Sequence, residues 1–340
     1  MDLFRRVSRT VSPQGRIFYG WYIAGAAGGL QGLSMMLWMQ SYGAYVVLLQ
    51  EEFGWGKAWL AGAFAMTRVE SGILGPLQGW LTDKYGPRAV LRTGILIFGL
   101  GFFLFSQVHT LLTFYVAFAL IAVGASLGGF ATVMVAIVNW FDRHRSKAIA
   151  FSLLGGSIGS LSVPVVFACL ELYGWRLTAF MSGFFVIVIG LPLAQVVRHK
   201  PTAFGENPDG IEFSVAKQNK KSITIPPDFT AREAMRSRAF WLISIGHACS
   251  LLTVSVVMVH LVPHLTEGLG YSLKHAGYIV ALLAASLLVG QVIGGYLGDR
   301  FNKRVICTLC MVAHAVGIML VTYASSIIMV AAFAIVYGVS

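Results

Sequence analysis

The chain has 340 residues, of which 57% are hydrophobic and only 11% are charged. Soluble domains carry about 25% charged residues, so this composition excludes an ordinary soluble enzyme. A mean hydropathy of +0.75 together with 38 glycines is typical of a helical protein that crosses the membrane several times. The net charge of +11 raises the question of a nucleic-acid partner, which the placement of the charges answers.

Apolar stretches along the chain predict nine complete membrane-spanning helices and the start of a tenth. A span needs about 20 apolar residues. The stretches in the first part of the chain are residues 19–49, 59–82, 89–108, 112–140, 147–172 and 175–197. After a polar segment come residues 239–265, 276–297 and 305–323, and a further stretch that begins at Ile327. The expected fold class is therefore an all-α membrane protein.

The basic residues predict how these helices are oriented. Of the 25 Lys and Arg residues, 21 fall in the N-terminal arm and in alternate loops on one side of the membrane. By the positive-inside rule that side is cytoplasmic, so we expect residues 1–18 to be the cytoplasmic arm of a multi-pass protein of the cell (inner) membrane. This distribution accounts for the positive charge. Because no basic patch is interleaved with aromatic residues, we expect no nucleic-acid partner.

The only long polar segment, residues 198–238, carries eight of these basic residues and four prolines. We interpret it as a cytoplasmic linker that serves only as a tether. Near its end, the sequence from Thr230 to Glu233 fits a capping box, in which each side chain bonds the other residue's backbone N–H. A short helix is predicted to start there.

Two stretches of the chain repeat each other. Residues 79–88 read GWLTDKYGPR and residues 295–304 read GYLGDRFNKR, and the two align without gaps. Each follows the second predicted helix of a group. Two homologous halves joined by a basic linker are a transporter architecture in which the solute site lies between the halves.

Both copies match the pattern Gly-x-Leu-x-Asp-(Arg/Lys)-x-x-x-Arg, and with it the chain resembles the major facilitator superfamily of transporters. The resemblance implies that superfamily's fold of two pseudo-symmetric six-helix halves, here residues 1–197 and residues 239–340, joined by the linker 198–238. Through the repeat, Ser340 aligns with Gly124 in the fourth helix of the first half. We therefore expect the second half to hold helices seven to nine and the start of ten, and the chain to be C-terminally incomplete.

Within the superfamily, the chain is similar to the monocarboxylate and oxalate–formate branch. The fragments that carry this similarity are Tyr19-Gly20-Trp21, Glu52-Phe53-Gly54-Trp55, Gly174-Trp175-Arg176, Gly205…Pro208-Asp209-Gly210 and Ala239-Phe240-Trp241. Monocarboxylate transporters place a lysine on helix one and an aspartate–arginine pair on helix eight. The matching positions here are Gln40, Leu287 and Gln291, so proton-coupled symport by that mechanism does not carry over. Gln40 and Gln291 remain candidates for hydrogen bonds to the solute.

The repeated loops supply a candidate gating motif. Its residues are Gly79, Asp83, Gly86 and Arg88 in the first copy and Gly295, Asp299, Arg300 and Arg304 in the second. A carboxylate at a helix end can face the positive N-terminus of a helix in the other half, and a glycine one turn earlier lets that helix approach. We expect such contacts to form in one transport state and to break in the other. The alternative is a static ion pair at the surface.

Polar and aromatic residues of the first predicted helix share one face at helical spacing. They are Gln31, Ser34, Trp38, Ser41, Tyr42 and Tyr45. One interpretation directs this face, and with it Gln31, Trp38 and Tyr42, toward a solute cavity, and the other assigns it to packing. His247, in the first helix of the second half, is a further cavity candidate. Residues 155–159 spell the hydrolase motif G-x-S-x-G, but small residues inside a membrane helix predict close packing instead.

Two ionisable residues, Arg68 and Glu70, fall inside the second predicted helix, and such residues are functional candidates by default. Arg68 comes about 14 Å along this helix and shares a face with the glycines at 72, 75 and 79. We predict that Arg68 binds the solute or takes part in gating. Because residues two apart on a helix point in different directions, Arg68 and Glu70 cannot pair with each other. Glu70 is expected to find its partner within its own bundle.

These observations predict a secondary active transporter of a small organic solute, expected to be an organic anion such as a carboxylate, working by alternating access as a symporter or antiporter. One alternative is an exporter of an amphipathic compound, which would need no buried cation. Another is a non-transporting membrane sensor or an inactive truncated copy of a transporter. We expect no enzyme activity, catalytic residue, cofactor or metal. The expected partners are the solute, a coupling ion and the lipid bilayer, with the protein as a monomer.

Overall fold

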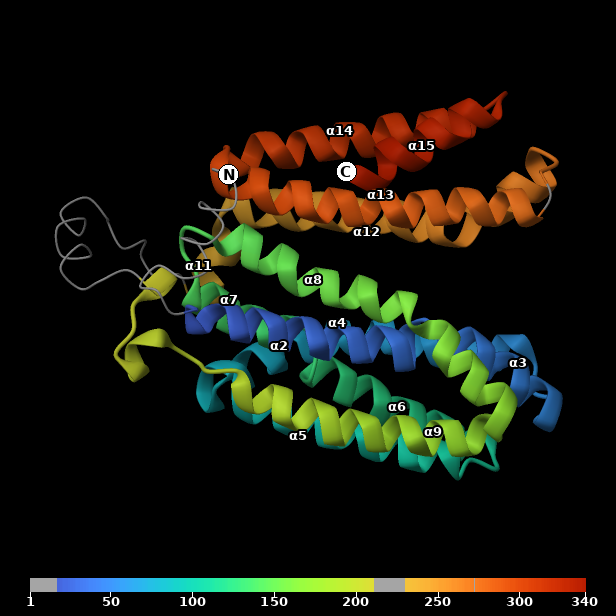
Figure 1. Cartoon of the computed structure of the whole chain (residues 1–340), viewed down its shortest axis with the longest axis horizontal. Coiled ribbons are helices and arrows are strands. Elements are labelled where there is room, and N and C mark those ends of the chain that lie inside the picture. The colour runs from blue at the N-terminus through green and yellow to red at the C-terminus, as the bar shows by residue number, and fades with distance from the viewer. Residues whose placement is uncertain (1–16, 211–229, 272) are drawn as a thin grey trace. The chain divides into compact units, whose positions relative to one another are not determined.

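The structure is a computed structural model that describes residues 17–210, 230–271 and 273–340. Inside these ranges, the side chains of a few residues, Arg68 among them, are not described. All regular elements of the described residues are helices (Figure 1). The chain divides into two compact units, residues 1–213 (unit 1) and residues 214–340 (unit 2).

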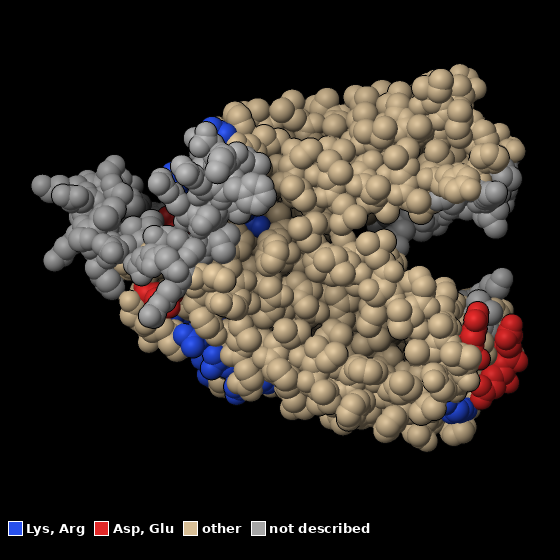
Figure 2. Space-filling view, viewed as in Figure 1, with Lys and Arg blue, Asp and Glu red and all other residues tan. Residues whose placement is uncertain are grey.

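Six helical runs in the described residues are long and apolar enough to cross a membrane. They are Tyr19–Phe53, Pro87–Ser106, Leu111–Trp140, Arg145–Val196, Tyr278–Arg300 and Lys303–Thr322. Figure 2 shows charged side chains at the ends of the helices and uncharged surface along them, as expected for helices that meet lipid. The chain is thus a multi-pass membrane protein.

Unit 1 begins with a helix that is less regular than the predicted single span. The helices of unit 1 are α2 (Tyr19–Ser34), a π-helical turn (Met35–Met39), α3 (Tyr42–Phe53), α4 (Lys57–Tyr85), α5 (Pro87–Ser106), α6 (Leu111–Leu127), α7 (Phe130–Trp140), α8 (Arg145–Leu161) and α9 (Val163–Val196). The predicted span 19–49 is therefore α2 and α3 with the π-helical turn between them, and it ends at Phe53.

Two other predicted spans of unit 1 are interrupted. The predicted helix 112–140 is broken between α6 and α7 at Gly128 and Gly129. The boundary predicted at residues 173–174 also differs, because α8 already ends at Leu161 and α9 starts at Val163. Pro164 has no N–H to continue the hydrogen bonds of α8, which explains the earlier end. Gly174, with φ of +74°, interrupts α9 where the boundary was predicted.

The G-x-S-x-G stretch confirms the packing interpretation. A Cβ at Gly155 would lie 2.2 Å from the carbonyl oxygen of Gly28, and a Cβ at Gly159 would lie 2.2 Å from that of Gly32. The backbones of α2 and α8 therefore touch along this seam. Any side chain here would separate the two helices, so Ser157 sits in a packing motif and not at a nucleophile turn.

Unit 2 contains the capping box and helices at the later apolar stretches, of which two meet the length and hydropathy of a membrane span among the described residues. Its elements are α11 (Ala231–Arg236), α12 (Arg238–Pro263), a π-helical turn (His264–Gly268), α13 (Leu273–Arg300), α14 (Lys303–Thr322) and α15 (Ile327–Val339). The helix α11 starts as predicted, because the Glu233 carboxylate accepts from the backbone N–H of Thr230 at 2.8 Å and the Thr230 hydroxyl accepts from that of Glu233 at 3.3 Å. Phe333 and Val330 of α15 are fully buried in the core of this unit.

Candidate functional site

The intramembrane candidates Arg68 and Glu70 both lie on α4. The side chain of Arg68 is outside the described residues, so its role stays a prediction. The Ser71 hydroxyl lies 3.2 Å from Oε2 of Glu70 and, closer, 2.9 Å from the carbonyl oxygen of Thr67, and Ser126 of α6 is a neighbour of the same carboxyl group. Oε1 of Glu70 is buried and receives no hydrogen bond from any described group. The described hydrogen-bond contact of Glu70 is thus a hydroxyl group, that of Ser71.

One polar residue of α4 was missed by the sequence analysis. Gln78 is buried, and its amide Nε2 donates to the carbonyl oxygen of Ser126 and to the Thr132 hydroxyl, both at 2.7 Å. It therefore ties α4 to both sides of the break between α6 and α7. A glutamine within the apolar stretch 72–81 of α4 was the available signal, but the break itself was not predicted.

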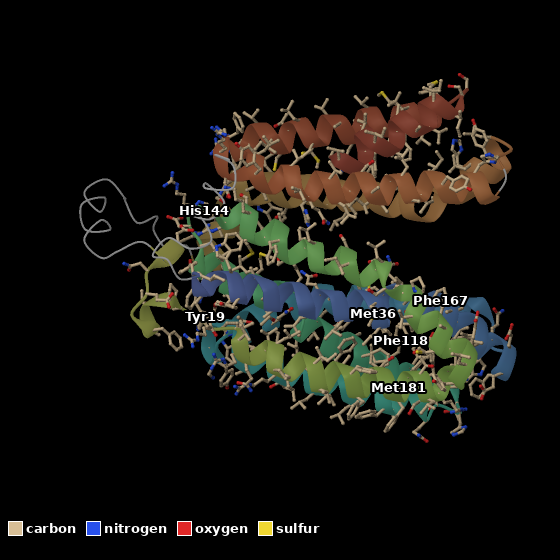
Figure 3. The ribbon with its side chains drawn as sticks, in the orientation of Figure 1. Tyr19, Met36, Phe118, His144, Phe167 and Met181 are labelled. Atoms are coloured by element: carbon tan, nitrogen blue, oxygen red, sulfur yellow. The ribbon has the colours of Figure 1, made fainter. Side chains whose placement is uncertain are left out.

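The aromatic residues of the first helix face the core of unit 1. Trp38 packs on Phe118, with ring centroids 4.4 Å apart, and Tyr42 stacks on Phe64 at 5.3 Å. The Tyr42 hydroxyl donates to the carbonyl oxygen of Leu60. Figure 3 labels Phe118 among these packed side chains. These contacts agree with the packing alternative for Trp38 and Tyr42 and do not place them at a cavity.

The glutamine and histidine candidates are spread over both units. Gln31 is half-buried on α2, beside Gly156 of α8. Gln40 is exposed, and its amide donates to the Ser160 hydroxyl at 3.4 Å. In unit 2, His247 is exposed on α12 and Gln291 is half-buried on α13. Their predicted contact with a solute stays a prediction.

The first copy of the repeated loop joins α4 to α5. Gly86 adopts φ of +80°, which favours glycine and ends α4, and Pro87 starts α5. The Arg88 guanidinium Nε donates to the carbonyl oxygen of Val197, at the end of α9, at 2.8 Å. Asp83 is exposed, and a Cβ at Gly79 would meet no described atom within 4 Å. Arg88 is thus a fixed anchor, whereas Asp83 and Gly79 remain accessible.

The end of α9 is held by side chains from three other helices. The last carbonyls of a helix have no partner inside it, so they must be satisfied from outside. The donor and acceptor pairs are Tyr19 to Val196 at 2.9 Å, Arg88 to Val197 at 2.8 Å, Trp140 to Arg198 at 2.9 Å and Asn139 to His199 at 3.2 Å. The chain is therefore fixed against unit 1 beyond residue 197.

The segment that follows, residues 198–210, corrects the expectation of a plain tether. Asp209 adopts φ of +58° and its side chain is only 2% exposed. Its carboxylate accepts from the backbone N–H groups of Asp142, Arg143 and His144, at 3.0, 2.6 and 3.3 Å, in the loop before α8. Nδ1 of His144 lies 3.2 Å from the same carboxylate. Tyr19 and His144 lie at the same end of unit 1 (Figure 3). We call residues 198–210 the docked segment.

Electrostatics around the docked segment follow from these contacts. Burial acts to raise the pKa of Asp209, but the hydrogen bonds from His144 and from the backbone of Arg143 and Asp142 outweigh it and lower this pKa below its usual value. Burial and the neighbouring Lys200 lower the pKa of His199, while Asp83 acts in the opposite direction. Asp83 is thus near enough to the docked segment to act on the charge of His199.

The second copy of the repeated loop joins α13 to α14. Gly295 is buried within α13, and Arg300 at the end of this helix donates to the Tyr296 hydroxyl. The Asn302 side chain accepts from the backbone N–H of Arg304 at 3.0 Å and so caps α14. Asp299 is half-buried.

A polar cluster closes the other end of unit 1. The Arg176 guanidinium lies 2.9 Å from the Glu52 carboxylate and donates to the carbonyl oxygen of Ser106 at 3.1 Å. The indole N–H of Trp175 donates to the same carboxylate. These are the residues by which the sequence resembled the monocarboxylate branch, and they tie α3 to α9. Among the described residues, no group of three His, Cys, Asp or Glu side chains could hold a metal ion.

Comparison with known proteins gives a family and several relatives. A sequence model described as Major Facilitator Superfamily matches residues 25–340. A protein named probable sulfoacetate transporter SauU, from Cupriavidus necator, is 27% identical over 270 residues, which cover 76% of this chain and 60% of that protein. Monocarboxylate transporter 13 of Bos taurus is 25% identical over 252 residues, 73% of this chain and 54% of that protein. The chain spans no more than 60% of the length of these two relatives.

A solved structure matches the fold. The proton:xylose symporter XylE bound to 6-bromo-6-deoxy-D-glucose superposes with a TM-score of 0.69 at 17% identity, over 95% of this chain and 78% of that one. At this identity, the likeness concerns the fold alone.

Proposed function

We propose that this chain, which belongs to the Major Facilitator Superfamily, is a secondary active transporter of a small organic anion. The observation that carries the proposal is that two relatives are named for sulfoacetate and for monocarboxylates, both small anions with a carboxylate. An anion that enters a site of low dielectric needs a counter-charge. The family's ionic positions on helices one and eight hold Gln40, Leu287 and Gln291 here, so the counter-charge must come from elsewhere.

Arg68 is the residue proposed to bind the anion. It falls in the interior of a predicted span, whereas the other Lys and Arg residues lie near the ends of the spans or outside them, and it lies on α4 on the face that carries Gly72, Gly75 and Gly79. A guanidinium group can hold a carboxylate through two parallel hydrogen bonds. Gln31, Gln40, Gln291 and His247 are proposed as further polar contacts to the solute.

The repeated loops are proposed to gate alternating access. Asp83 is exposed at the end of α4, as a group must be if it makes contacts in only one transport state. Asp299, Arg300 and Arg304 take the corresponding part in the second copy. Arg88 is assigned a different role, because its guanidinium is already bound to the end of α9.

We also propose that the N-terminal arm and residues 198–238 are cytoplasmic and that the protein resides in the inner membrane. The positive-inside distribution supports this orientation. A single cysteine introduced as Lys220→Cys should not react with an impermeant thiol reagent added to intact cells. Strong labelling from outside would reverse the orientation.

Uptake into liposomes tests the anion proposal. The protein expressed from its complete reading frame should take up labelled sulfoacetate or a short monocarboxylate. Arg68→Gln should lose about 2–5 kcal/mol of binding free energy, the usual cost of removing one partner of a buried charge pair, and Arg68→Lys should lose less. Arg143→Gln, an exposed arginine of the loop before α8, is the matched control. Correctly folded Arg68→Gln with unchanged affinity would contradict the proposal.

An exporter of an amphipathic compound is the second candidate, favoured by the uncharged residues at positions 40, 287 and 291. The same liposomes decide between the two. Extrusion of a lipophilic dye without transport of any carboxylate would support export.

A further inference from the structure

Glu70 occupies an unusual position for a carboxyl group. It lies in the interior of α4, far from both Lys57 and Tyr85 at the helix ends. The Ser71 hydroxyl lies 3.2 Å from one of its oxygens but also bonds the carbonyl oxygen of Thr67 at 2.9 Å, and the other oxygen, Oε1, is buried without a donor from the described residues. A carboxylate ion in such a place lacks the hydrogen bonds that water would give it, whereas a protonated carboxyl group loses much less.

The break between α6 and α7 is held by backbone hydrogen bonds and by close packing. The N–H groups of Gly128 and Gly129 bond back to Gly124 and Ser126. A Cβ at Gly94 would lie 2.3 Å from the backbone nitrogen of Gly128, so the backbone of α5 presses directly on the break.

Gln78 of α4 bonds both sides of this break. Its amide donates to the carbonyl oxygen of Ser126 and to the Thr132 hydroxyl, and Glu70 lies about two turns earlier on the same helix, with Ser126 as a neighbour. Interrupted membrane helices are where transporters place ion and solute sites. Polar residues of α4 thus lie along an interrupted helix inside the bundle. Of Glu70 and Gln78, only Glu70 can gain or lose a proton.

Within the described part of unit 1, the helices packed on α4 bring no charge to Glu70. The helix α7 contains no titratable residue, and α6 contains only Tyr115, whose hydroxyl donates to the carbonyl oxygen of Trp59. On α5 the basic residues are Arg88 and Arg92, both in the first two turns and bound to α9.

The remaining neighbours are α3 and α4 itself. On α3, the Tyr42 hydroxyl donates to a carbonyl, and Glu52 pairs with Arg176 at the end of unit 1, next to Glu51. Tyr45 is buried among aromatic rings. On α4, Arg68 is two residues from Glu70, a spacing that puts the two positions on different sides of a helix.

We propose that Glu70 is the proton-binding group of this transporter. A proton from water on one side of the membrane forms an O–H bond at Oε1, travels with the anion in the same transport cycle, and returns to water on the other side. One proton with one monovalent anion makes the transported pair electrically neutral. The proposal rests on the proposed function. It assigns the proton as the coupling ion and Glu70 as the residue that carries it. Gln78 and Thr132 stabilise the break between α6 and α7 and do not titrate.

A pH gradient across liposomes tests the coupling. With the outside more acidic by about one pH unit, a cycle that carries one proton supports accumulation of about tenfold. Protein from the complete reading frame should reach this accumulation of a labelled short monocarboxylate, and Glu70→Gln should not accumulate it. Glu70→Asp, which keeps a carboxyl group, should restore accumulation with a shifted pH profile. Glu171→Gln, an exposed carboxyl group of α9, should behave as the parent.

Anion exchange without a gradient separates coupling from folding. Exchange by Glu70→Gln should persist and lose its dependence on pH. Gradient-driven accumulation by Glu70→Gln equal to that of the parent would overturn the proposal. So would accumulation driven by a sodium gradient and indifferent to pH. If Glu70→Gln loses anion exchange and Glu70→Asp does not restore it, Glu70 has a structural role. That outcome would also overturn the proposal.

Infrared spectroscopy tests Glu70 even if no anion is transported. The C=O stretch of a protonated carboxyl group should be present in the parent, respond to pH and be missing in Glu70→Gln, but not in Glu171→Gln. Failure of all anion transport with this band present would refute the proposed function and leave the proton site standing. Identical spectra for the parent and Glu70→Gln would refute the proton site.

Discussion

The two copies of the repeated loop share a sequence pattern but end their helices differently. In the first copy, Gly86 with φ of +80° ends α4 and Pro87 begins α5 at once. In the second copy, Asn302 separates α13 from α14 and caps α14 with its side chain. One turn relies on backbone conformation and the other on a side-chain hydrogen bond.

The last arginine of the pattern also differs between the copies. The Arg88 side chain reaches the carbonyl oxygen of Val197, at the end of α9 and just before the docked segment. The backbone N–H of Arg304 is the donor to the Asn302 cap. A repeated pattern therefore preserves where a helix ends, while the surrounding chain decides what each residue binds. In the first copy, that surrounding chain is the docked segment.

Removal of the Asp209 carboxylate is expected to have the largest effect on this arrangement. Asp209→Ala leaves the backbone N–H groups of residues 142–144 without their acceptor, and each unsatisfied buried donor is costly. We expect a loss of about 2–4 kcal/mol in the free energy of unfolding. Thermal unfolding of the purified protein in detergent measures it. Asp142→Ala, whose side chain is 77% exposed, is the control and should change little. Equal effects of the two substitutions would show that the docked segment is only a tether.

The turn of the first copy is expected to be more sensitive than that of the second. Gly86→Ala forces a Cβ into a backbone conformation that side chains rarely adopt, and that Cβ would lie 3.3 Å from Nδ1 of His199. The expected cost is about 1–3 kcal/mol. Asn302→Ala removes an exposed cap and should cost about 1 kcal/mol or less. Unfolding of both variants by the same denaturant measures the loss in the free energy of unfolding for each. A larger loss for Asn302→Ala than for Gly86→Ala would contradict the expectation.

Several of these features could be predicted from the sequence, and the reasons are local. The capping box of Thr230 and Glu233 needs only neighbouring residues, and the spacing of Gly155 and Gly159 in an apolar stretch indicates close packing. The break at Gly128 and Gly129 was missed because the apolar residues continue on both sides of it, and paired glycines are common in membrane helices.

The docked segment was missed for a different reason. Its prolines and basic residues have the composition of a tether, while its stability comes from contacts with residues 139–144, far away in the sequence. Asp209 and Gly210 after a proline were the visible signal, because this pattern favours a tight turn. The face of Trp38 and Tyr42 was ambiguous in principle, since packing and a cavity produce the same spacing.

We expect Arg88 to contribute less to the free energy of unfolding than the turn at Gly86. Arg88→Ala removes one hydrogen bond from a charged donor to the end of α9, which should cost about 1–2 kcal/mol. Arg304→Ala keeps the backbone donor that meets Asn302 and should cost less. The difference between the two midpoints of thermal unfolding is the quantity to measure. A larger effect at Arg304 would mean that the second copy has an anchor of equal weight.

The smallest expected effect is the pH dependence of the docked segment. The pKa of Asp209 is lower in the folded protein than in the unfolded chain, where the pKa of an aspartate is about 3.9. A group of this kind adds its full stabilisation above the unfolded pKa and loses it as the pH falls through the folded pKa. The free energy of unfolding should therefore decrease on acidification below about pH 4, more steeply in the parent than in Asp209→Asn. The decrease should be smaller than the loss in Asp209→Ala, because a protonated carboxyl group still offers an oxygen to the loop before α8. Unfolding midpoints of the two proteins between neutral and acidic pH test this. Parallel curves would show that the Asp209 charge does not hold the docked segment in place.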